Sequence, residues 1–225
     1  MGTMIKLKAS DGFTLGAYEA KPAGKARGGL VVIQEIFGVN AHIQHVCDGY
    51  AADGYRVLSP AIFDRAERDA QLSYDKPDID KGVALRAKIP LEETILDIAA
   101  AVDALKGEGK VAIVGYCYGG SLAWIGGARV PGLSAAIGYY GGMVSKHLDE
   151  RPPCPVMLHY GEKDQGIPLS DVEKIRAATD PKKVQVFTYP AAGHAFNREG
   201  NHAYEAASAR LARARTLELL AEAVG

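Results

Sequence analysis

The segment VAIVGYCYGG, residues 111–120, restricts the fold of this chain more than any other. Four apolar residues lead into a cysteine that has a glycine two positions before it and two positions after it. The next residues, SLAWIGGARV, have a helical composition, so the segment predicts a strand, a tight turn and a helix. Small residues beside such a turn prevent clashes between strand and helix. We therefore expect Cys117 to project from the carboxyl edge of a sheet, where open α/β sheets bind ligands.

The rest of the chain has the alternation of an α/β protein. Short runs rich in Val, Ile and Leu are separated by longer segments with helical spacing, which is typical of βαβ units around a mostly parallel sheet. Most of these runs are apolar throughout, as expected for strands that are covered on both faces. The expected core strands are LVVIQE (30–35), RVLSPA (56–61), VAIVGY (111–116), AAIGYY (135–140), VMLHYG (156–161) and VQVFTY (184–189).

Other segments predict helices and a hairpin. A helix is expected after Asn40, which is a good N-cap residue, and a second over 91–105, where apolar residues form a continuous stripe. The Ala- and Leu-rich segment 201–224 predicts a long closing helix. Alternating residues over 6–22 predict an antiparallel hairpin at the sheet edge. The polar, Asp-rich stretch 64–82 predicts a surface excursion near the entrance of a site.

Length and composition indicate a globular protein with one core. A chain of 225 residues predicts a single domain over 1–225. Hydrophobic residues make up 48% and charged residues 24%, which is ordinary globular composition. The net charge of −1 gives no electrostatic reason to expect nucleic acid or an anionic membrane as a partner.

Targeting signals and cysteine usage point to the cytoplasm. The chain has no run of eighteen apolar residues and no apolar segment of signal-peptide type near its start. The three cysteines Cys47, Cys117 and Cys154 are widely spaced and form no C-x-x-C pair, which suits a reducing compartment.

Two further residues follow Cys117 in the order that an α/β-hydrolase triad requires. Asp164 lies in the loop GEKDQGIP after one expected strand, and His194 lies in AAGHAF after the next. His194 would take the thiol proton and return it to the leaving group, while Asp164 would orient the ring. Taken alone, Cys117 is compatible with a small buried residue and Asp164 with a turn cap. The ordered triple favours catalysis.

Glu35 and the histidines outside the ordered triple were considered as further site residues. Glu35 ends an apolar strand, so it is either exposed at the strand end or placed in the same crevice as Cys117. His42 and His45 lie one helical turn apart with no third ligand at metal spacing, which favours a solvated helix face and no metal site. His159 lies within an expected strand, as a core residue.

The motifs VIQEIFGVN, GYCYGG, YYGG, GEKDQGIP and AAGHAFNR occur in this order. With them, the chain resembles the dienelactone hydrolase family, the carboxymethylenebutenolidases, from about residue 10 to its end. The resemblance implies an α/β-hydrolase fold and a cofactor-free Cys-His-Asp triad that opens lactone rings in chloroaromatic degradation. It implies Cys117 as nucleophile, His194 as base and Asp164 as acid.

The resemblance also assigns neighbouring residues. It implies that Glu35 contacts the resting cysteine and helps to activate it when substrate displaces the carboxylate. The oxyanion hole would be the backbone amides of Ile36 and Tyr118, the second being the residue after the nucleophile. Arg198 would bind a substrate carboxylate, and Tyr139 and Phe37 would line the pocket.

Several residues depart from the family pattern. The family has a second carboxylate-binding arginine and a tyrosine where this chain has Ile79 and Val83. Lys81 or Arg86 could take the place of the missing arginine. Gly166 and Ala195 stand where the family has an aromatic residue and a serine, so we expect a wider and less polar pocket.

The sequence therefore predicts a monomeric, cytoplasmic hydrolase without cofactor or metal that cleaves a small ester or lactone through a thioester on Cys117. One alternative is a broad carboxylesterase or thioesterase without dienelactone activity. Another, from a different class, is a non-catalytic redox-sensing protein in which Cys117 is oxidised. Nucleotide binding lacks support because neither G-x-G-x-x-G after a strand nor G-x-x-x-x-G-K-[ST] occurs.

Overall fold

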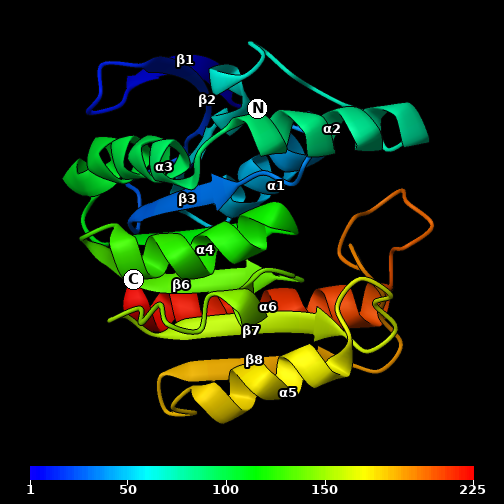
Figure 1. Cartoon of the computed structure of the whole chain (residues 1–225). Helices are drawn as coiled ribbons and strands as arrows, with labels where there is room; N and C mark the ends of the chain where they lie inside the picture. The colour runs from blue at the N-terminus through cyan, green and yellow to red at the C-terminus, as the bar shows by residue number, and fades with distance from the viewer.

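All eight strands of the protein belong to one sheet, in the order β1-β2-β4-β3-β5-β6-β7-β8 (Figure 1). The structure is a computed structural model that describes residues 1–225. β2 pairs antiparallel with β1 and β4, and all other pairings are parallel. The strands are β1 (Thr3–Lys8), β2 (Thr14–Ala20), β3 (Gly29–Ile33), β4 (Arg56–Pro60), β5 (Val111–Tyr116), β6 (Leu133–Tyr139), β7 (Val156–Gly161) and β8 (Val184–Tyr189).

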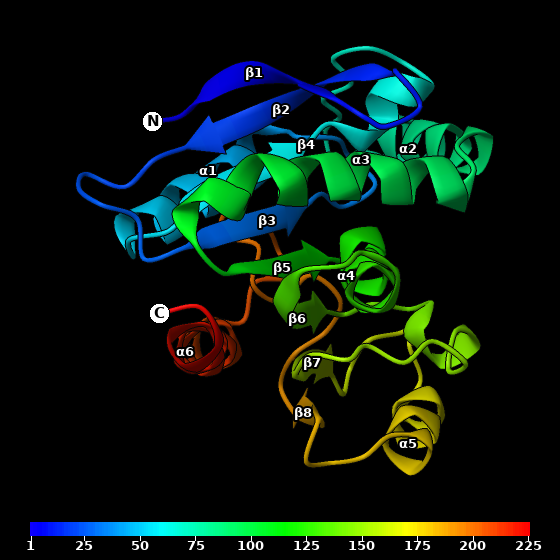
Figure 2. The same cartoon turned by 90° about the vertical axis from the view of Figure 1, so that its left-hand side faces the viewer.

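Helices cover both faces of this sheet. α6 lies on one side of β6, β7 and β8, and α4 and α5 lie on the other (Figure 2). The α-helices are α1 (Ala41–Ala52), α2 (Lys76–Lys88), α3 (Leu91–Leu105), α4 (Tyr118–Arg129), α5 (Leu169–Ala178) and α6 (Ala206–Ala223). Three short 3-10 helices are η1 (Ile62–Arg65), η2 (Lys106–Glu108) and η3 (Val144–Lys146). The expected architecture, a mostly parallel sheet flanked by helices, is confirmed.

The apolar runs of the sequence form the central strands. All six residues of β5 and of β7 and all five of β3 are buried, because helices pack on both faces of these strands. The predicted hairpin is also confirmed: β1 is an edge strand paired with β2. Asn40 caps α1 as expected, since its side chain accepts a hydrogen bond from the amide of Ile43 at 3.2 Å.

The prediction for residues 64–82 was incomplete. Part of this segment is irregular, but α2 begins at Lys76, with Asp75 as an N-cap whose side chain accepts from the Asp78 amide. Only Gly82 and Leu85 of this helix are buried, so the apolar stripe that identifies most helices is nearly absent. The closing helix α6 begins at Ala206, later than expected, after Glu205 has capped it.

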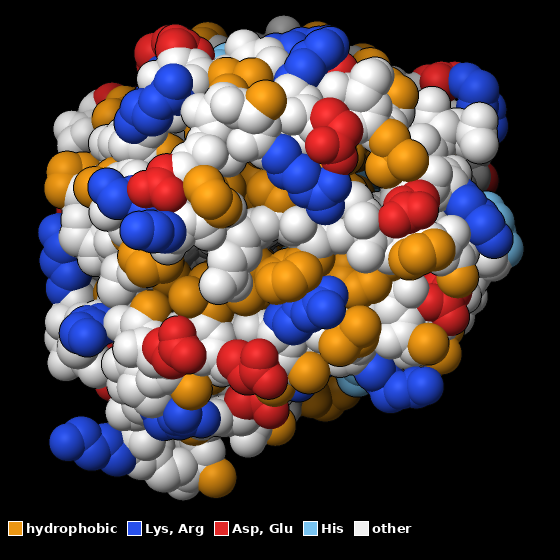
Figure 3. Space-filling view, turned by 90° about the horizontal axis from the view of Figure 1, so that it is seen from below, with side chains coloured by type: hydrophobic (Ala, Val, Ile, Leu, Met, Phe, Trp, Pro, Cys, Tyr) orange, Lys and Arg blue, Asp and Glu red, His pale blue; other side chains and the backbone are white.

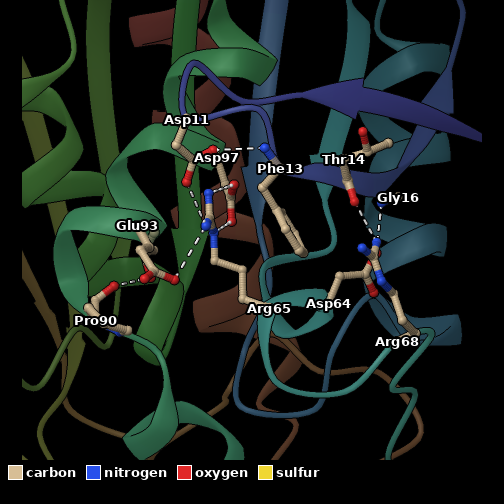
Figure 4. A network of polar contacts seen from close by, with 11 residues as sticks. Asp11, Phe13, Thr14, Gly16, Asp64, Arg65, Arg68, Pro90, Glu93 and Asp97 are labelled. Atoms are coloured by element: carbon tan, nitrogen blue, oxygen red, sulfur yellow. Dashed lines mark hydrogen bonds and ion pairs between the residues drawn. The ribbon is translucent and has the colours of Figure 1, made fainter.

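An ion-pair network around the buried pair of Arg65 and Asp97 joins the N-terminal hairpin to the helices beside the sheet (Figure 4). Arg65 at the end of η1 forms two parallel hydrogen bonds of 2.8 Å with Asp97 of α3. The same guanidinium bonds to Asp11 at 2.8 Å and Glu93 at 3.3 Å and lies over the ring of Phe13. The network holds Arg65 at the end of η1 against α3, and so anchors the start of the segment that leads to α2.

β8 forms the other edge of the sheet. The face at this end carries a band of apolar side chains bordered by charged ones (Figure 3). None of the helices combines the length and the hydrophobicity that a membrane crossing requires.

Candidate active site

Cys117 occupies a strained turn between β5 and α4. Its φ of 56° and ψ of −114° lie outside the regions that a side chain with a Cβ prefers. A Cβ at Gly115 would lie 1.9 Å from the Gly119 carbonyl oxygen, and a Cβ at Gly119 would lie 2.4 Å from that of Ile33. These contacts explain why glycine is required on both sides of the cysteine. The Cys117 side chain is half-buried at the carboxyl end of its strand, as predicted.

Asp164 and His194 come together from the loops that follow β7 and β8. Two backbone hydrogen bonds join these loops, from Glu162 to Tyr189 at 3.0 Å and from Lys163 to Ala192 at 2.9 Å. The side chains then meet, with Asp164 Oδ2 2.7 Å from His194 Nδ1. The Asp164 side chain is 1% exposed and the His194 side chain 38%, so the ring is accessible and its partner is not.

The two partners of the His194 ring determine its charge. Burial lowers the pKa of His194, but hydrogen bonds to Asp164 and to the Cys117 sulfur outweigh burial and raise the pKa to about 10. Asp164 also accepts a hydrogen bond from the Gly166 amide at 2.8 Å, which fixes the carboxylate. The arrangement can hold a proton on His194 next to the Cys117 sulfur at neutral pH.

Glu35 lies two residues beyond β3 and is wholly buried, so the alternative of an exposed strand end is wrong. Its Oε1 accepts from Arg198 Nη2 at 3.2 Å, while its Oε2 has no hydrogen-bond partner. Burial raises the pKa of Glu35, and the charges of Arg198 and His194 oppose that rise. No hydrogen bond joins Glu35 to Cys117 in this structure; the carboxylate faces Arg198 and the sulfur interacts with His194.

Arg198 is held by aromatic rings as well as by its ion pair. Its guanidinium lies 4.0 Å from the ring centroid of Tyr74 and 5.6 Å from that of Phe37. These two rings pack edge to face with their centroids 4.7 Å apart. Phe37 thus lies at the site as predicted, and Tyr74 is a residue that the sequence analysis missed. No sequence pattern marked Tyr74, because it lies in the irregular part of 64–82.

Tyr140, rather than Tyr139, packs against His194. The ring centroids of Tyr140 and His194 are 4.8 Å apart, and the Tyr140 hydroxyl donates to Asn197. Tyr139 was expected to line the pocket, but its hydroxyl bonds to Thr216 of α6 at 2.7 Å and its ring packs on His159. The backbone explains the difference, since Tyr140 has a φ of 40° and so leaves the alternation of the strand.

The amides of Ile36 and Tyr118 are free to bind an oxygen. Tyr118 is the first residue of α4, so its N–H has no partner within the helix. The Ile36 amide donates no hydrogen bond within the protein. α2 packs directly over Ile36, because a Cβ at Gly82 would lie 2.0 Å from the Ile36 carbonyl oxygen.

The structure separates the two cations that were expected to replace the missing arginine. Lys81 is exposed and forms an ion pair with Glu67 at 2.6 Å, so it does not reach the site. Arg86 lies over the Tyr118 ring, 4.7 Å from its centroid. Ile79 packs against the core, and Val83 is 51% exposed.

Gly166 and Ala195 lie beside Asp164 and His194. Gly166 has space around it, since a Cβ there would meet only Asp164 Oδ1 at 3.4 Å. Ala195 is buried with a φ of 60°.

Three histidines lie away from Cys117, Asp164 and His194, and they differ in burial. His159 is buried and bonds to Tyr189 and Thr216, which confirms it as a core residue. His45 is exposed as predicted, but His42 is largely covered and its Nε2 is buried without a partner. The prediction of a solvated face was therefore wrong for His42. No group of His, Cys, Asp and Glu has a metal-binding arrangement.

Comparison with known proteins places the chain among hydrolases. The model of the dienelactone hydrolase family matches residues 15–224. A carboxymethylenebutenolidase of Pseudomonas putida is 32% identical over 225 residues, which cover 96% of this chain and 95% of that protein.

Solved structures agree with this comparison. A Klebsiella pneumoniae protein assigned as a dienelactone hydrolase superposes with a TM-score of 0.87 at 28% identity, over 99% of this chain and 98% of its own. A dienelactone hydrolase-like promiscuous phosphotriesterase from metagenomic libraries superposes with a TM-score of 0.77 at 22% identity, over 100% and 99% of the two chains. The fold is thus that of the α/β hydrolases.

Proposed function

Because this chain belongs to the dienelactone hydrolase family, we propose that it is a carboxylic ester hydrolase that opens a small lactone or ester through a thioester on Cys117. The contact of 2.7 Å between Asp164 and His194, at the sheet edge where Cys117 follows β5, is the observation that carries the proposal. The Cys117 sulfur also contributes to the raised pKa of His194. An acid, a base and a nucleophile in this order form the relay that acyl transfer needs.

The first half of the reaction forms the acyl-enzyme. With the thiol proton already on His194, as its raised pKa favours, the Cys117 sulfur attacks the carbonyl carbon of the substrate. The oxygen gains the negative charge, and the free amides of Ile36 and Tyr118 stabilise it. The bond to the leaving oxygen then breaks, and that oxygen receives the proton from His194. In a lactone, the leaving oxygen remains attached to the acyl group.

The second half releases the product. His194 removes a proton from a water molecule, the resulting hydroxide attacks the thioester carbon, and the bond to sulfur breaks. The carboxylic acid leaves, and His194 keeps the proton beside the Cys117 sulfur, as in the resting enzyme. Asp164 holds the His194 ring in one orientation throughout the reaction. Its Oδ2 accepts a hydrogen bond from His194 Nδ1–H, which leaves His194 Nε2 for the proton transfers.

Glu35 and Arg198 are proposed to respond to the substrate. A substrate carboxylate that binds Arg198 would compete with Glu35, which would then be released toward Cys117. Because Glu35 is buried with one oxygen unpartnered, its displacement changes the charge near the sulfur. We expect Glu35→Gln to change the rate at which iodoacetamide alkylates the resting enzyme. Equal rates in the variant and the wild type would remove Glu35 from the mechanism.

A carboxylesterase or thioesterase without dienelactone activity is the second candidate function. Four residues favour this second candidate because they offer few polar groups to a small acidic lactone. They are Ile79, Val83, Gly166, which has open space around it, and Ala195, which is buried.

One assay tests the proposal and separates the two candidates. The ultraviolet absorbance of a dienelactone is followed after mixing with purified protein, beside the Cys117→Ala variant and a panel of neutral esters and lactones. Loss of dienelactone that depends on Cys117 supports dienelactone hydrolysis. Loss of neutral esters alone supports the second candidate. A Cys117→Ala variant with wild-type turnover would exclude the thioester mechanism.

A further inference from the structure

A cavity of about 220 Å³ lies between α1 and α6. Both helices cover the same face of the sheet, which is the far face in the view of Figure 1. The chain that links β8 to α6 closes one side of the cavity with Asn197, Glu199 and Tyr204. None of the three residues of the proposed triad lines it, so the cavity is separate from the candidate active site.

Three tyrosine rings form much of the cavity wall. Tyr50 of α1, Tyr116 at the end of β5 and Tyr139 at the end of β6 are all buried. The rings of Tyr116 and Tyr139 pack with their centroids 4.8 Å apart. An apolar cavity of about 150 Å³ can hold benzene, so this one has room for a single ring with small substituents. Aromatic walls favour an aromatic occupant, because rings pack well in offset and edge-to-face pairs.

Polar atoms in the wall have hydrogen-bonding capacity that the protein does not use. The hydroxyls of Tyr50 and Tyr116 lie 3.1 Å apart, so one donates to the other, and the accepting hydroxyl keeps its own O–H without an acceptor. The side-chain oxygen of Asn197 accepts from Tyr140, and its amide group has no acceptor. His42 Nε2 is buried without a partner. Since an unsatisfied buried polar atom costs free energy, the inner wall favours an occupant that carries an oxygen acceptor.

Two arginines of α6 add positive charge to the cavity. Arg210 is exposed, so it lies at the cavity mouth, and it forms no ion pair. Arg213 lies over the Tyr50 ring, 5.3 Å from its centroid, and only its Nη2 is engaged by Asp53. One acid, the exposed Glu199, lines the cavity. A guanidinium is planar and can donate two parallel hydrogen bonds to a carboxylate, so the mouth favours that group.

We propose that this cavity, named here the α1–α6 cavity, is a second ligand site that binds a small aromatic carboxylate with a phenolic oxygen. The ring lies among the tyrosines, the carboxylate pairs with Arg210 at the mouth, and the phenolic oxygen accepts from the spare tyrosine O–H. Asn197 and Glu199 line the cavity, whereas Arg198 between them pairs with Glu35. An occupant would therefore contact the chain on both sides of Arg198 without competing for its guanidinium. The proposal does not depend on ester hydrolysis.

Calorimetry of the wild-type protein with three matched probes tests the chemistry of the ligand. 4-Hydroxybenzoate carries both oxygen groups, 4-hydroxybenzamide has a neutral amide in place of the carboxylate, and benzoate lacks the phenolic oxygen. 4-Hydroxybenzoate should bind one to one. The amide should bind at least about tenfold more weakly and benzoate at least about fivefold, as expected when a charge-assisted or a buried hydrogen bond is lost. Equal affinity for the three probes, or no binding of 4-hydroxybenzoate below about 10 mM, would overturn the proposal.

Variants of both helices test where the probe lies. Gly49→Leu fills the cavity from α1, because a Cβ there would meet only Arg213 Nη2, at 3.6 Å, and leucine is more favourable than glycine in a helix. It should weaken 4-hydroxybenzoate at least about tenfold. Arg210→Met should weaken 4-hydroxybenzoate about tenfold and 4-hydroxybenzamide less than about twofold. Arg215→Met is the control, since it removes a cation of α6 that lies over Phe187 outside the cavity, and it should leave both affinities unchanged.

Two outcomes with these variants would overturn the proposal. Unchanged affinity in Gly49→Leu would place the probe outside the cavity. Equal losses in Arg210→Met and Arg215→Met would show a general effect of charge on α6.

Alkylation of Cys117 separates this site from the catalytic one. Iodoacetamide attaches a group to the sulfur and blocks the proposed nucleophile, whether or not the protein hydrolyses esters. A probe in the α1–α6 cavity should bind the alkylated protein with an affinity within about twofold of the unmodified protein. Loss of binding on alkylation would place the probe at the nucleophile and overturn the assignment.

Discussion

The buried carboxylate of Glu35 is paired with the guanidinium of Arg198, whose Nη2 lies 3.2 Å from Oε1. The two residues are separated by 163 positions in the chain, so this ion pair ties the loop after β3 to the loop after β8. A buried charge whose partner is removed is strongly destabilising, because desolvation is no longer compensated.

Arg198→Met should therefore lower the free energy of unfolding by about 3–5 kcal/mol at pH 8. Burial already raises the pKa of Glu35 in the folded state, and loss of Arg198 raises it further. The unfolded protein ionises Glu35 above about pH 4.3, and the folded variant resists this ionisation. The deficit should be small at pH 4.5 and grow as the pH rises. Urea unfolding at both pH values measures it, and Glu35→Gln combined with Arg198→Met should recover much of the loss.

His194→Gln should slow the alkylation of Cys117. The pKa of about 10 keeps His194 protonated at pH 6.5, where the ring charge stabilises a neighbouring thiolate. Without that charge next to the sulfur, iodoacetamide labelling at pH 6.5 should fall at least about tenfold. The rate of iodoacetamide labelling between pH 6 and 9 tests this, with Cys117→Ala giving the background from the other two cysteines. Identical pH profiles would contradict the pairing.

Gly115→Ala should destabilise the turn that carries the nucleophile. The added Cβ would lie 1.9 Å from the Gly119 carbonyl oxygen, which is backbone and cannot move without shifting α4. We expect a loss of about 2–3 kcal/mol or more in unfolding free energy. Gly107→Ala is the control, because nothing lies within 4 Å of a Cβ there, and its effect should stay within about 0.5 kcal/mol. Equal Tm values for the two variants would disprove the steric argument.

Asp97→Ala should weaken the anchor of the N-terminal hairpin. Asp97 is buried and makes both parallel hydrogen bonds to Arg65, although Asp11 and Glu93 still contact that guanidinium. We expect a loss of about 3 kcal/mol, the lower end for a broken buried pair. Asp103→Asn, which removes an exposed ion pair from the same helix, should cost less than about 1 kcal/mol. Chemical unfolding of both variants compares them.

The sequence was most informative where one strong local signal decides the structure. β5, β7 and β8 match their expected bounds because their apolar runs end at glycine, proline or polar residues. The glycines around Cys117 specified the nucleophile turn for a steric reason that the structure confirms. Cys117, Asp164 and His194 could be named from chain order because loops after parallel strands meet at one edge of a sheet.

Other features depend on tertiary contacts that leave little trace in the chain. α2 has a weak apolar pattern because few of its residues are buried, although Asp75 followed by Pro77 was a start signal. The choice between adjacent Tyr139 and Tyr140 required the φ of 40° at Tyr140. The partners of Glu35 and Arg86 could not be predicted either, since each lies far away in the sequence.

The residues of the proposed triad and α2 follow different strands of the sheet. Cys117, Asp164 and His194 follow β5, β7 and β8, while α2 lies between β4 and α3. Substitutions on the exposed side of α2 can therefore change the surroundings of the site without replacing any residue of the proposed triad. For protein engineering, exposed positions of α2 such as Val83 are the first to randomise, while Gly82 and the glycines around Cys117 are best left unchanged because their neighbours leave no room for a side chain.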